Sequence, residues 1–386
     1  MAKLHAGGKW SSALRRVIML AGLTLLTACY GHSLPLENPY VISPEGPLRA
    51  ELFVDAYGNF YPEGWRWLGG GDKAWKKRNL FEGSAEVRGQ VEAGEERQLK
   101  NVAAFGQKLS RVFILIHGFN NTYTEAAAPF DDIESKLNLK PGDGVIRFNW
   151  DGLTGSGPAA LGIWFPAAHN SKLAGSRGLR RVLDRFAGKE IYIIAHSRGA
   201  SVVLSALHNP VYDEAFRTKI GNRLGAGFLT PPALASRNTI HILLLAPAIG
   251  RPDFCNADQQ GEFDLSQSCA DLPPLSDQVS SLRYSLNEKD PVLRKGVGLS
   301  DVLNPTGLGT KPGVGDALIL RYPLMTKYKM EKPKHFHAFG CYAAEPIFTR
   351  MLADDKIARV PLPPPALLPP PSPERRRCHL SKAPAK

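Results

Sequence analysis

The chain has 386 residues, of which 43% are hydrophobic and 22% charged, an ordinary composition for a globular protein. Its formal net charge of +12 is concentrated at the two ends, because residues 1–28 and residues 361–386 each carry +4 and leave only +4 for the body between them. So small an excess argues against a nucleic-acid partner. We therefore expect one large domain with appended ends and no nucleic-acid binding.

Residues 1–28 have the pattern of a bacterial secretory signal. A basic start is followed by an almost wholly apolar run from Val17 to Ala28, which is too short to cross a bilayer as a helix. The run ends in Leu26-Thr-Ala-Cys29, which resembles the lipobox of bacterial lipoproteins. The resemblance implies that Cys29 is the lipid-modified first residue of the mature protein, and Tyr30 favours the outer membrane, facing the periplasm. The alternative is a plain signal peptide or a signal anchor with an unrelated cysteine.

Beyond Cys29 the sequence predicts three regions. Residues 29–48 are polar and proline-rich, as expected of a tether, and residues 49–360 form the folded domain, with an N-terminal hairpin and extension over 49–107. Residues 361–386 are proline-rich and basic, which favours an extended tail without a core; the tail either contacts an envelope surface or has no specific partner. The extension contains three tryptophans that either pack over the core edge or form a ligand platform: Trp65, Trp67 and Trp75.

Secretion changes how the cysteines are interpreted. Cys255 and Cys269 flank a polar loop, and an oxidising periplasm permits a bridge between them, with two free thiols as the open alternative. No cysteine pair has the spacing of zinc ligands, so we predict neither a metal nor a cofactor.

The most informative stretch runs from Lys189 to Leu204. Ile191 to Ala195 is apolar and β-branched, as in a buried strand, and the apolar residues from Ala200 onward recur at helical spacing. Between them lies Ala195-His-Ser197-Arg-Gly, the layout of a nucleophile elbow, in which small flanking residues permit a tight turn that presents a serine at a helix N-terminus. The alternative is an ordinary strand-to-helix connection that contains a serine.

Two further buried strands precede the elbow, at Arg111–His117 and Val145–Trp150. The segment from Thr122 to Leu137 predicts a helix interrupted or kinked by Pro129, and Lys172 to Phe186 predicts a basic amphipathic helix. This alternation predicts an α/β fold with a mostly parallel central sheet and helices on both faces.

The motifs His117-Gly-Phe-Asn-Asn, Phe148-Asn-Trp150 and Ala195-His-Ser-Arg-Gly together resemble the α/β-hydrolase fold, and most closely an uncharacterised bacterial branch of it. The resemblance covers roughly residues 108–350 and implies the order serine, acid, histidine along the chain. It also implies that the amides of Phe119 and Arg198 form an oxyanion hole, while His117 holds the loop. It implies no substrate.

The acid is expected after a later strand. Thr239–Ala246 and Ser281–Leu286 are the next two predicted strands, and Asp290 follows the second, just before Pro291. Asp290 is the preferred acid and Glu288 the substitute; the alternative is that Asp290 is merely a turn residue.

The base is expected after a last strand that lies between Ala317 and Met330 and before a helix over Ala343–Leu352. His337 is preferred over His335, and a metal pair formed by the two lacks a third ligand. Three other histidines are in the wrong place for this order, in a loop, at a helix end and in a strand: His169, His208 and His241.

We therefore expect a lipid-anchored serine hydrolase that cleaves an ester or related acyl bond of a small molecule or lipid through an acyl-enzyme. Ser197, His337 and Asp290 are its candidate catalytic residues, and the side chain of Arg198 either favours an anionic substrate or packs. The competing class is a non-catalytic envelope lipoprotein that uses the same scaffold for binding. A weaker third class is an envelope-binding protein that acts through its basic tail.

Overall fold

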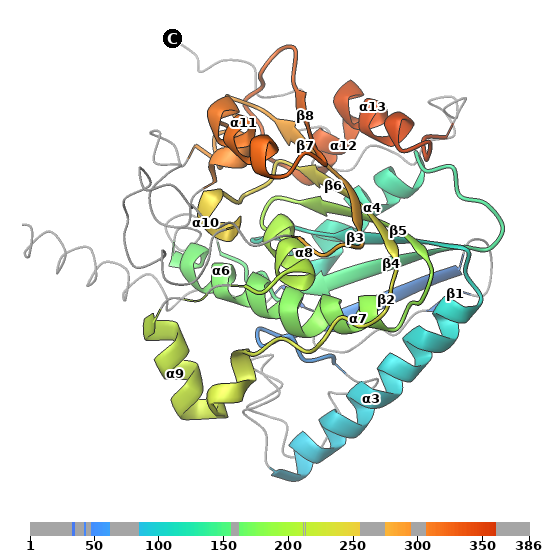
Figure 1. Ribbon diagram of the computed structural model, residues 1–386, viewed down its shortest axis with the longest axis vertical. Coiled ribbons are helices and arrows are strands. Elements are labelled where there is room, and N and C mark those ends of the chain that lie inside the picture. Colours follow the sequence, from blue (N-terminus) through green and yellow to red (C-terminus); the bar gives the residue numbers. More distant parts are fainter. Residues whose placement is uncertain are drawn as a thin grey trace, which may run out of the picture.

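A sheet of eight strands in the order β1-β2-β4-β3-β5-β6-β7-β8 forms the centre of the molecule (Figure 1). Strands β2 to β8 are mutually parallel, and β1 pairs antiparallel with β2. The fold class expected from the sequence is thus confirmed. The strands are β1 (Ile42–Ser43), β2 (Leu48–Val54), β3 (Arg111–Ile116), β4 (Asp143–Trp150), β5 (Glu190–His196), β6 (Thr239–Leu245), β7 (Val279–Leu286) and β8 (Met325–Lys329).

The computed structural model describes residues 33–34, 42–43, 48–61, 85–155, 162–210, 212, 214–254, 275–294 and 306–359. The predicted signal sequence, Cys29, the three tryptophans of the extension, Cys255, Cys269 and the tail lie outside these residues, so the expectations placed on them stay predictions. Within the described part of the chain, no helix combines the length and the apolarity needed to cross a membrane.

Two hydrophobic cores lie on opposite faces of the sheet, because successive side chains of each buried strand alternate between them. In β3, Val112 and Ile114 enter the first core, and Phe113 and Leu115 enter the second. The helices that cover the first face are α3 (Ala85–Gln107), α7 (Arg180–Asp184), α8 (Gly199–Leu207), α10 (Arg251–Phe254) and α11 (Pro312–Arg321). Those that cover the second are α4 (Tyr123–Glu134), α12 (Phe339–Ala344) and α13 (Pro346–Asp354).

The helical segment before the elbow strand differs from the one expected over Lys172–Phe186. It consists of α6 (Trp164–Leu173), the π-helix η4 (Ala174–Leu179) and α7, so His169 lies in a helix and not in the loop expected for it. In η4, a Cβ on Gly175 would come within 2.2 Å of the carbonyl oxygen of Val202 in α8. The wider π turn therefore coincides with a close helix approach that the local sequence pattern does not reveal.

Three other expectations need correction. The hairpin expected around Gly58–Asn59 is present only in short form, as a turn with an antiparallel bridge between Val54 and Phe60, and β2 itself pairs with β4 and joins the central sheet. Helix α4 ends at Glu134 and runs through Pro129; its first turn is held by a capping box between Thr122 and Glu125. The helix expected over Ala343–Leu352 is divided into α12 and α13 at Pro346, whose ring suits the start of a new helix.

The remaining helical elements lie at the periphery. Figure 1 shows α9 (Glu214–Leu224) projecting from the body beside the short 3-10 helix η5 (Ala226–Leu229). A second 3-10 helix, η7 (Gly307–Gly309), precedes α11 near the carboxyl end of β7, where Leu308 donates its amide to the carbonyl of Ile249.

Candidate active site

Ser197 lies in a sharp turn between β5 and α8. Its φ of +51° is in the left-handed region, which is costly for any residue with a Cβ. Its amide donates to the carbonyl of Leu245 at 2.9 Å, and its carbonyl accepts from the amide of Ala248 at 3.0 Å, so the end of β6 holds the turn in place. A Cβ on Gly199 would lie 2.7 Å from the carbonyl oxygen of His117, which explains the glycine two residues after the serine. Ala195 has the small side chain that such a turn requires and is fully buried.

The side chains of Ser197, His337 and Asp290 form a continuous hydrogen-bonded array. The hydroxyl of Ser197 lies 2.8 Å from Nε2 of His337, and Nδ1 of the same ring lies 2.8 Å from Oδ2 of Asp290. The three residues are separated by up to 140 positions in sequence but follow β5, β7 and β8 at the same end of the sheet. The structure therefore brings together the three candidate catalytic residues predicted from the sequence.

Asp290 is fully buried and its two oxygens are used differently. Oδ1 accepts from the amides of Val292 and Leu293, both at 3.0 Å, which fixes the carboxyl group relative to its own turn. Oδ2 faces the imidazole of His337 and also accepts from the hydroxyl of Tyr342 at 2.7 Å. Glu288, the alternative acid, points elsewhere and pairs with Lys329 at 2.6 Å.

His196, which precedes the serine, holds the backbone of the histidine in the array. Its Nε2 lies 2.8 Å from the carbonyl oxygen of His337, and its ring stacks on Phe339 at 4.7 Å between centroids. Burial lowers the pKa of His196 well below its ordinary value, so the ring is neutral and Nε2–H is the donor. His335, the alternative base, is exposed, and the histidine that is hydrogen-bonded to Ser197 is His337.

The loop after β3 lies directly against the serine. A Cβ on Gly118 would come within 2.8 Å of Cβ of Ser197, so only glycine permits this approach. Among the described residues, no hydrogen bond uses the backbone amide of Phe119 or of Arg198 as a donor. Both amides adjoin the Ser197–Gly118 contact, where a substrate oxygen would develop negative charge.

His117 has the holding position expected for it. Its ring accepts from the amide of Trp150 at 3.2 Å and lies 2.7 Å from the carbonyl of Gly118, and its own carbonyl accepts from the Trp150 indole at 2.8 Å. Burial lowers the pKa of His117 to about 4, so the ring is neutral near pH 7 and fixes the loop without carrying charge.

The side chain of Arg198 is packed inside the molecule. Only 2% of the residue is exposed; its guanidinium donates to the carbonyl of Ala248 at 2.6 Å, lies 5.5 Å from the ring of Trp164 and 3.8 Å from Asp253. Burial lowers the pKa of Arg198 below its ordinary value, and the charge of Asp253 opposes that shift. Of the two roles considered for this side chain, packing is the one the contacts support.

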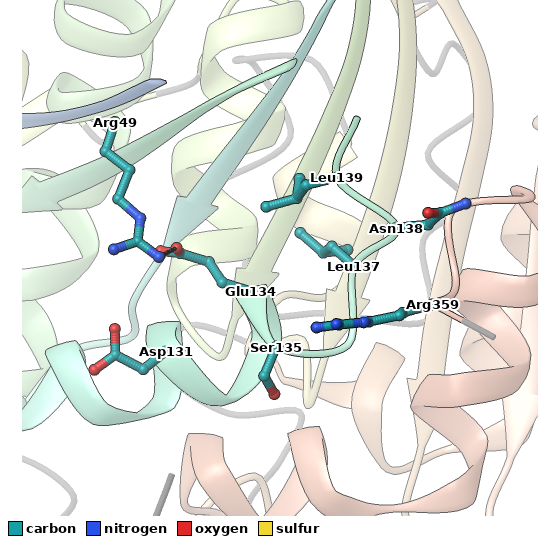
Figure 2. A pocket seen from close by; sticks show the side chains of 8 residues that line it. All are labelled: Arg49, Asp131, Glu134, Ser135, Leu137, Asn138, Leu139 and Arg359. Atoms are coloured by element: carbon teal, nitrogen blue, oxygen red, sulfur yellow. Dashed lines mark ion pairs between the residues drawn. The ribbon is translucent and has the colours of Figure 1, made fainter. Parts of the chain in front are cut away.

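A cavity of about 650 Å³ lies elsewhere, at the amino end of the sheet (Figure 2). Arg49 near the start of β2, Glu134 at the end of α4 and residues 137–139 before β4 contribute to its wall, with Arg359 opposite. Figure 2 shows the Arg49 side chain directed at Glu134, to which it is paired at 2.7 Å. None of the predicted site residues lines this cavity, so its size does not make it the reaction site. Groups of three or more potential metal ligands are absent from the described residues.

A largely parallel sheet covered on both faces, with a serine on a strained strand-to-helix turn after β5, defines the α/β-hydrolase fold. Residues 94–262 match the model of the family described as "Alpha/beta hydrolase of unknown function (DUF900)". The match contains Gly118 and Ser197 and ends before Asp290 and His337.

Comparison with individual proteins adds little. Among curated proteins, none matches the sequence. A solved structure titled "Bacterial Heroin Esterase" is similar over 64% of this chain and 72% of its own, at 13% identity and a TM-score of 0.28. At that level the likeness says nothing about the substrate.

Sequence reasoning missed three residues of the site: Asn287, Tyr342 and the side chain of His196. Asn287 accepts from the amide of Lys334 at 2.9 Å and donates to its carbonyl at 2.8 Å, which ties the end of β7 to the segment that carries His337. Asn287 immediately follows an alternating strand and was therefore visible as a strand-end polar residue. Tyr342 carries no such signal, because it lies in a short helix of ordinary composition.

Proposed function

We propose that this protein is a serine hydrolase that cleaves an ester or a related acyl bond through an acyl-enzyme. The observation that carries the proposal is the array of two 2.8 Å hydrogen bonds that joins Ser197, His337 and Asp290. In such an array the imidazole can take the serine proton, and the carboxylate orients the ring and stabilises its charged form. The left-handed backbone of Ser197 supports the proposal, since strain of this kind concentrates at functional sites.

The proposed reaction has two halves. Oγ of Ser197 attacks the acyl carbonyl carbon while its proton moves to Nε2 of His337, and the carbonyl π electrons move to oxygen. When the tetrahedral intermediate collapses, the bond to the leaving oxygen breaks and that oxygen receives the proton from Nε2, which leaves an ester on Ser197. Water then attacks this ester with His337 again as base, and the acid and Ser197–OH are released.

The amides of Phe119 and Arg198 are proposed to hold the oxyanion. They are uncommitted among the described residues, and the glycine between His117 and Phe119 allows the loop to approach the serine closely. Loss of one such donor typically lowers the rate by ~10² to 10³. The half-buried ring of Phe119, edge-on to Trp164 at 4.9 Å, supplies apolar surface beside this position.

We also propose that the protein is anchored in the cell envelope through a lipid on Cys29, with the outer membrane as its site. The apolar run that ends at Cys29 supports this, and Cys341 is disulfide-bonded, as expected in an oxidising compartment. Incorporation of an alkyne fatty acid into the wild-type protein, but not into Cys29→Ser, is the expected result. Equal labelling of the variant would contradict lipidation at this cysteine.

The decisive test of the hydrolase proposal is covalent labelling of the mature protein with a fluorophosphonate probe. Ser197 attacks phosphorus, fluoride leaves and the serine proton passes to His337, so labelling requires an activated serine. We expect rapid labelling of the wild type and none of Ser197→Ala. A folded wild-type protein that stays unlabelled over hours would favour the non-catalytic binding scaffold. A panel of p-nitrophenyl esters of increasing chain length would then define the acyl preference of a labelled protein.

A further inference from the structure

We propose that Tyr342 is a positioning residue for the reaction, which holds Asp290 in register with His337 and sets how strongly that carboxylate attracts the imidazole. The inference rests on the proposed hydrolase function and deepens it. Tyr342 touches neither the serine nor any reacting atom, and acts through Asp290 alone.

The direction of the Tyr342 hydrogen bond follows from its neighbours. Nδ2 of Asn287 lies 3.1 Å from the Tyr342 hydroxyl oxygen and can only donate, so the hydroxyl accepts from Asn287. Its own proton is therefore directed to Oδ2 of Asp290, at 2.7 Å. Burial, reinforced by the charge of Asp290, raises the pKa of Tyr342 well above its ordinary value, so the hydroxyl keeps this proton across the working pH range.

The position of this bond has two consequences. Oδ2 is the oxygen that faces Nδ1 of His337, so Tyr342 prevents the carboxyl group from rotating away from the imidazole. The same donor also withdraws negative charge from Oδ2 and reduces its attraction for a protonated ring. Tyr342 is thereby expected to hold the carboxylate in line with the imidazole and to moderate the attraction between them.

The contacts around Tyr342 allow a variant to remove the hydroxyl and keep the packing of the ring. Tyr342 is fully buried, and its ring packs edge-on against Phe336 at 5.1 Å, contacts that phenylalanine would keep. The titratable groups that face His337 or Tyr342 are Asp290, His196 and Glu345, and Glu345 is paired with Lys334 at 2.6 Å. Burial keeps His196 neutral, so Asp290 is the charge that the hydroxyl acts upon.

The experiment is the second-order rate constant of fluorophosphonate labelling, measured from pH 5 to pH 9 for the wild type and Tyr342→Phe. We expect the plateau rate of the variant to fall about twentyfold, within the range for loss of one hydrogen bond to a charged group. We also expect the pH of half-maximal labelling to rise, because a carboxylate that has lost the Tyr342 donor presents more negative charge to the ring. A purely structural role would lower thermal stability without moving that midpoint.

Tyr328→Phe is the matched control. The Tyr328 hydroxyl likewise donates to a carboxylate, that of Asp354, but β8 and α13 place this pair away from the serine. We expect the control to label as the wild type does at every pH. A folded Tyr342→Phe with wild-type plateau and midpoint would overturn the inference while leaving the hydrolase proposal intact. Failure of the wild type itself to label would instead overturn the proposed function.

Discussion

At the carboxyl end of the sheet, Oδ2 of Asp290 accepts hydrogen bonds from Tyr342 and from Nδ1 of His337, and Nε2 of His337 accepts from the hydroxyl of Ser197. Beside the cavity at the other end, charged side chains of α4, β2 and β4 pair with one another and form an ion-pair network. Arg147 contacts Asp131, lies 2.6 Å from Glu134 and 3.7 Å from Glu51, and Glu134 also pairs with Arg49. Both regions bury polar groups at high cost.

The difference between the two regions shows that buried polar groups can serve either stability or chemistry, depending on how they are paired. In the ion-pair network each charge is neutralised by another side chain, so removal of one member leaves its partners uncompensated. In the array, the last member is a neutral hydroxyl whose proton can leave. A reactive site therefore needs a group that can give up its proton to a neighbouring base, and the ion-pair network has no hydroxyl among its described members.

Substitution inside the array has the largest expected effect. Asp290→Asn keeps the shape but cannot accept from Nδ1–H of His337 as the carboxylate does, so we expect labelling and ester hydrolysis to fall by about 10³- to 10⁴-fold. Thermal unfolding monitored by circular dichroism provides the check on folding. A folded variant that retains more than a tenth of the wild-type rate would show that Asp290 is not the acid.

Substitution at the oxyanion loop is expected to have the next largest effect. Gly118→Ala places a Cβ 2.8 Å from Cβ of Ser197, which must shift the serine or the loop, and we expect the labelling rate to fall about 10²-fold. Gly89→Ala is the matched control, because a Cβ there meets nothing within 4 Å in α3. The control should label normally, and its free energy of unfolding should exceed that of the wild type by about 0.5 to 1 kcal/mol. Normal labelling of Gly118→Ala would contradict the close approach.

Substitution in the ion-pair network should change the stability of the protein and leave its labelling rate unchanged. Arg147→Gln leaves Glu134, whose side chain is 3% exposed, with one fewer cation, so we expect the free energy of unfolding to fall by about 3 kcal/mol. Denaturant titration measures this change, and the labelling rate of the folded fraction should equal that of the wild type. A large loss of labelling rate would show that the two regions are coupled.

The smallest expected effect is a pH dependence of the free energy of unfolding, caused by His117 at the carboxyl end of the sheet. His117 has a pKa of about 4 in the folded protein and about 6.5 when unfolded, so between these values the unfolded chain binds a proton that the folded chain does not. Unfolding is therefore favoured as the pH falls, by about 1.4 kcal/mol per pH unit for this residue. Denaturant titrations at pH 7.5, 6 and 5 should show the slope, and His117→Asn should reduce it. An unchanged slope would contradict a neutral His117.

The central strands were predictable because each is an apolar run buried on both faces, which has few other interpretations. Ser197, Asp290 and His337 were predictable from their positions at the ends of strands in a fixed order. The pairing of β2 with β4 was not, since Leu48–Val54 suits a hairpin equally well and only the neighbouring strand decides between them. The π turn of η4, the burial of the Arg198 side chain and the role of Tyr342 all depend on contacts between segments far apart in sequence.

The left-handed backbone of Ser197 implies a conflict between thermal robustness and reactivity at one position. Glycine adopts φ of +51° without the steric cost that a Cβ incurs, so Ser197→Gly should yield a protein that folds more favourably and no longer reacts. Random mutagenesis followed by selection for heat resistance alone would be expected to recover this substitution. Selection for turnover would remove it, and the identity of residue 197 thus reports which pressure has acted on the molecule.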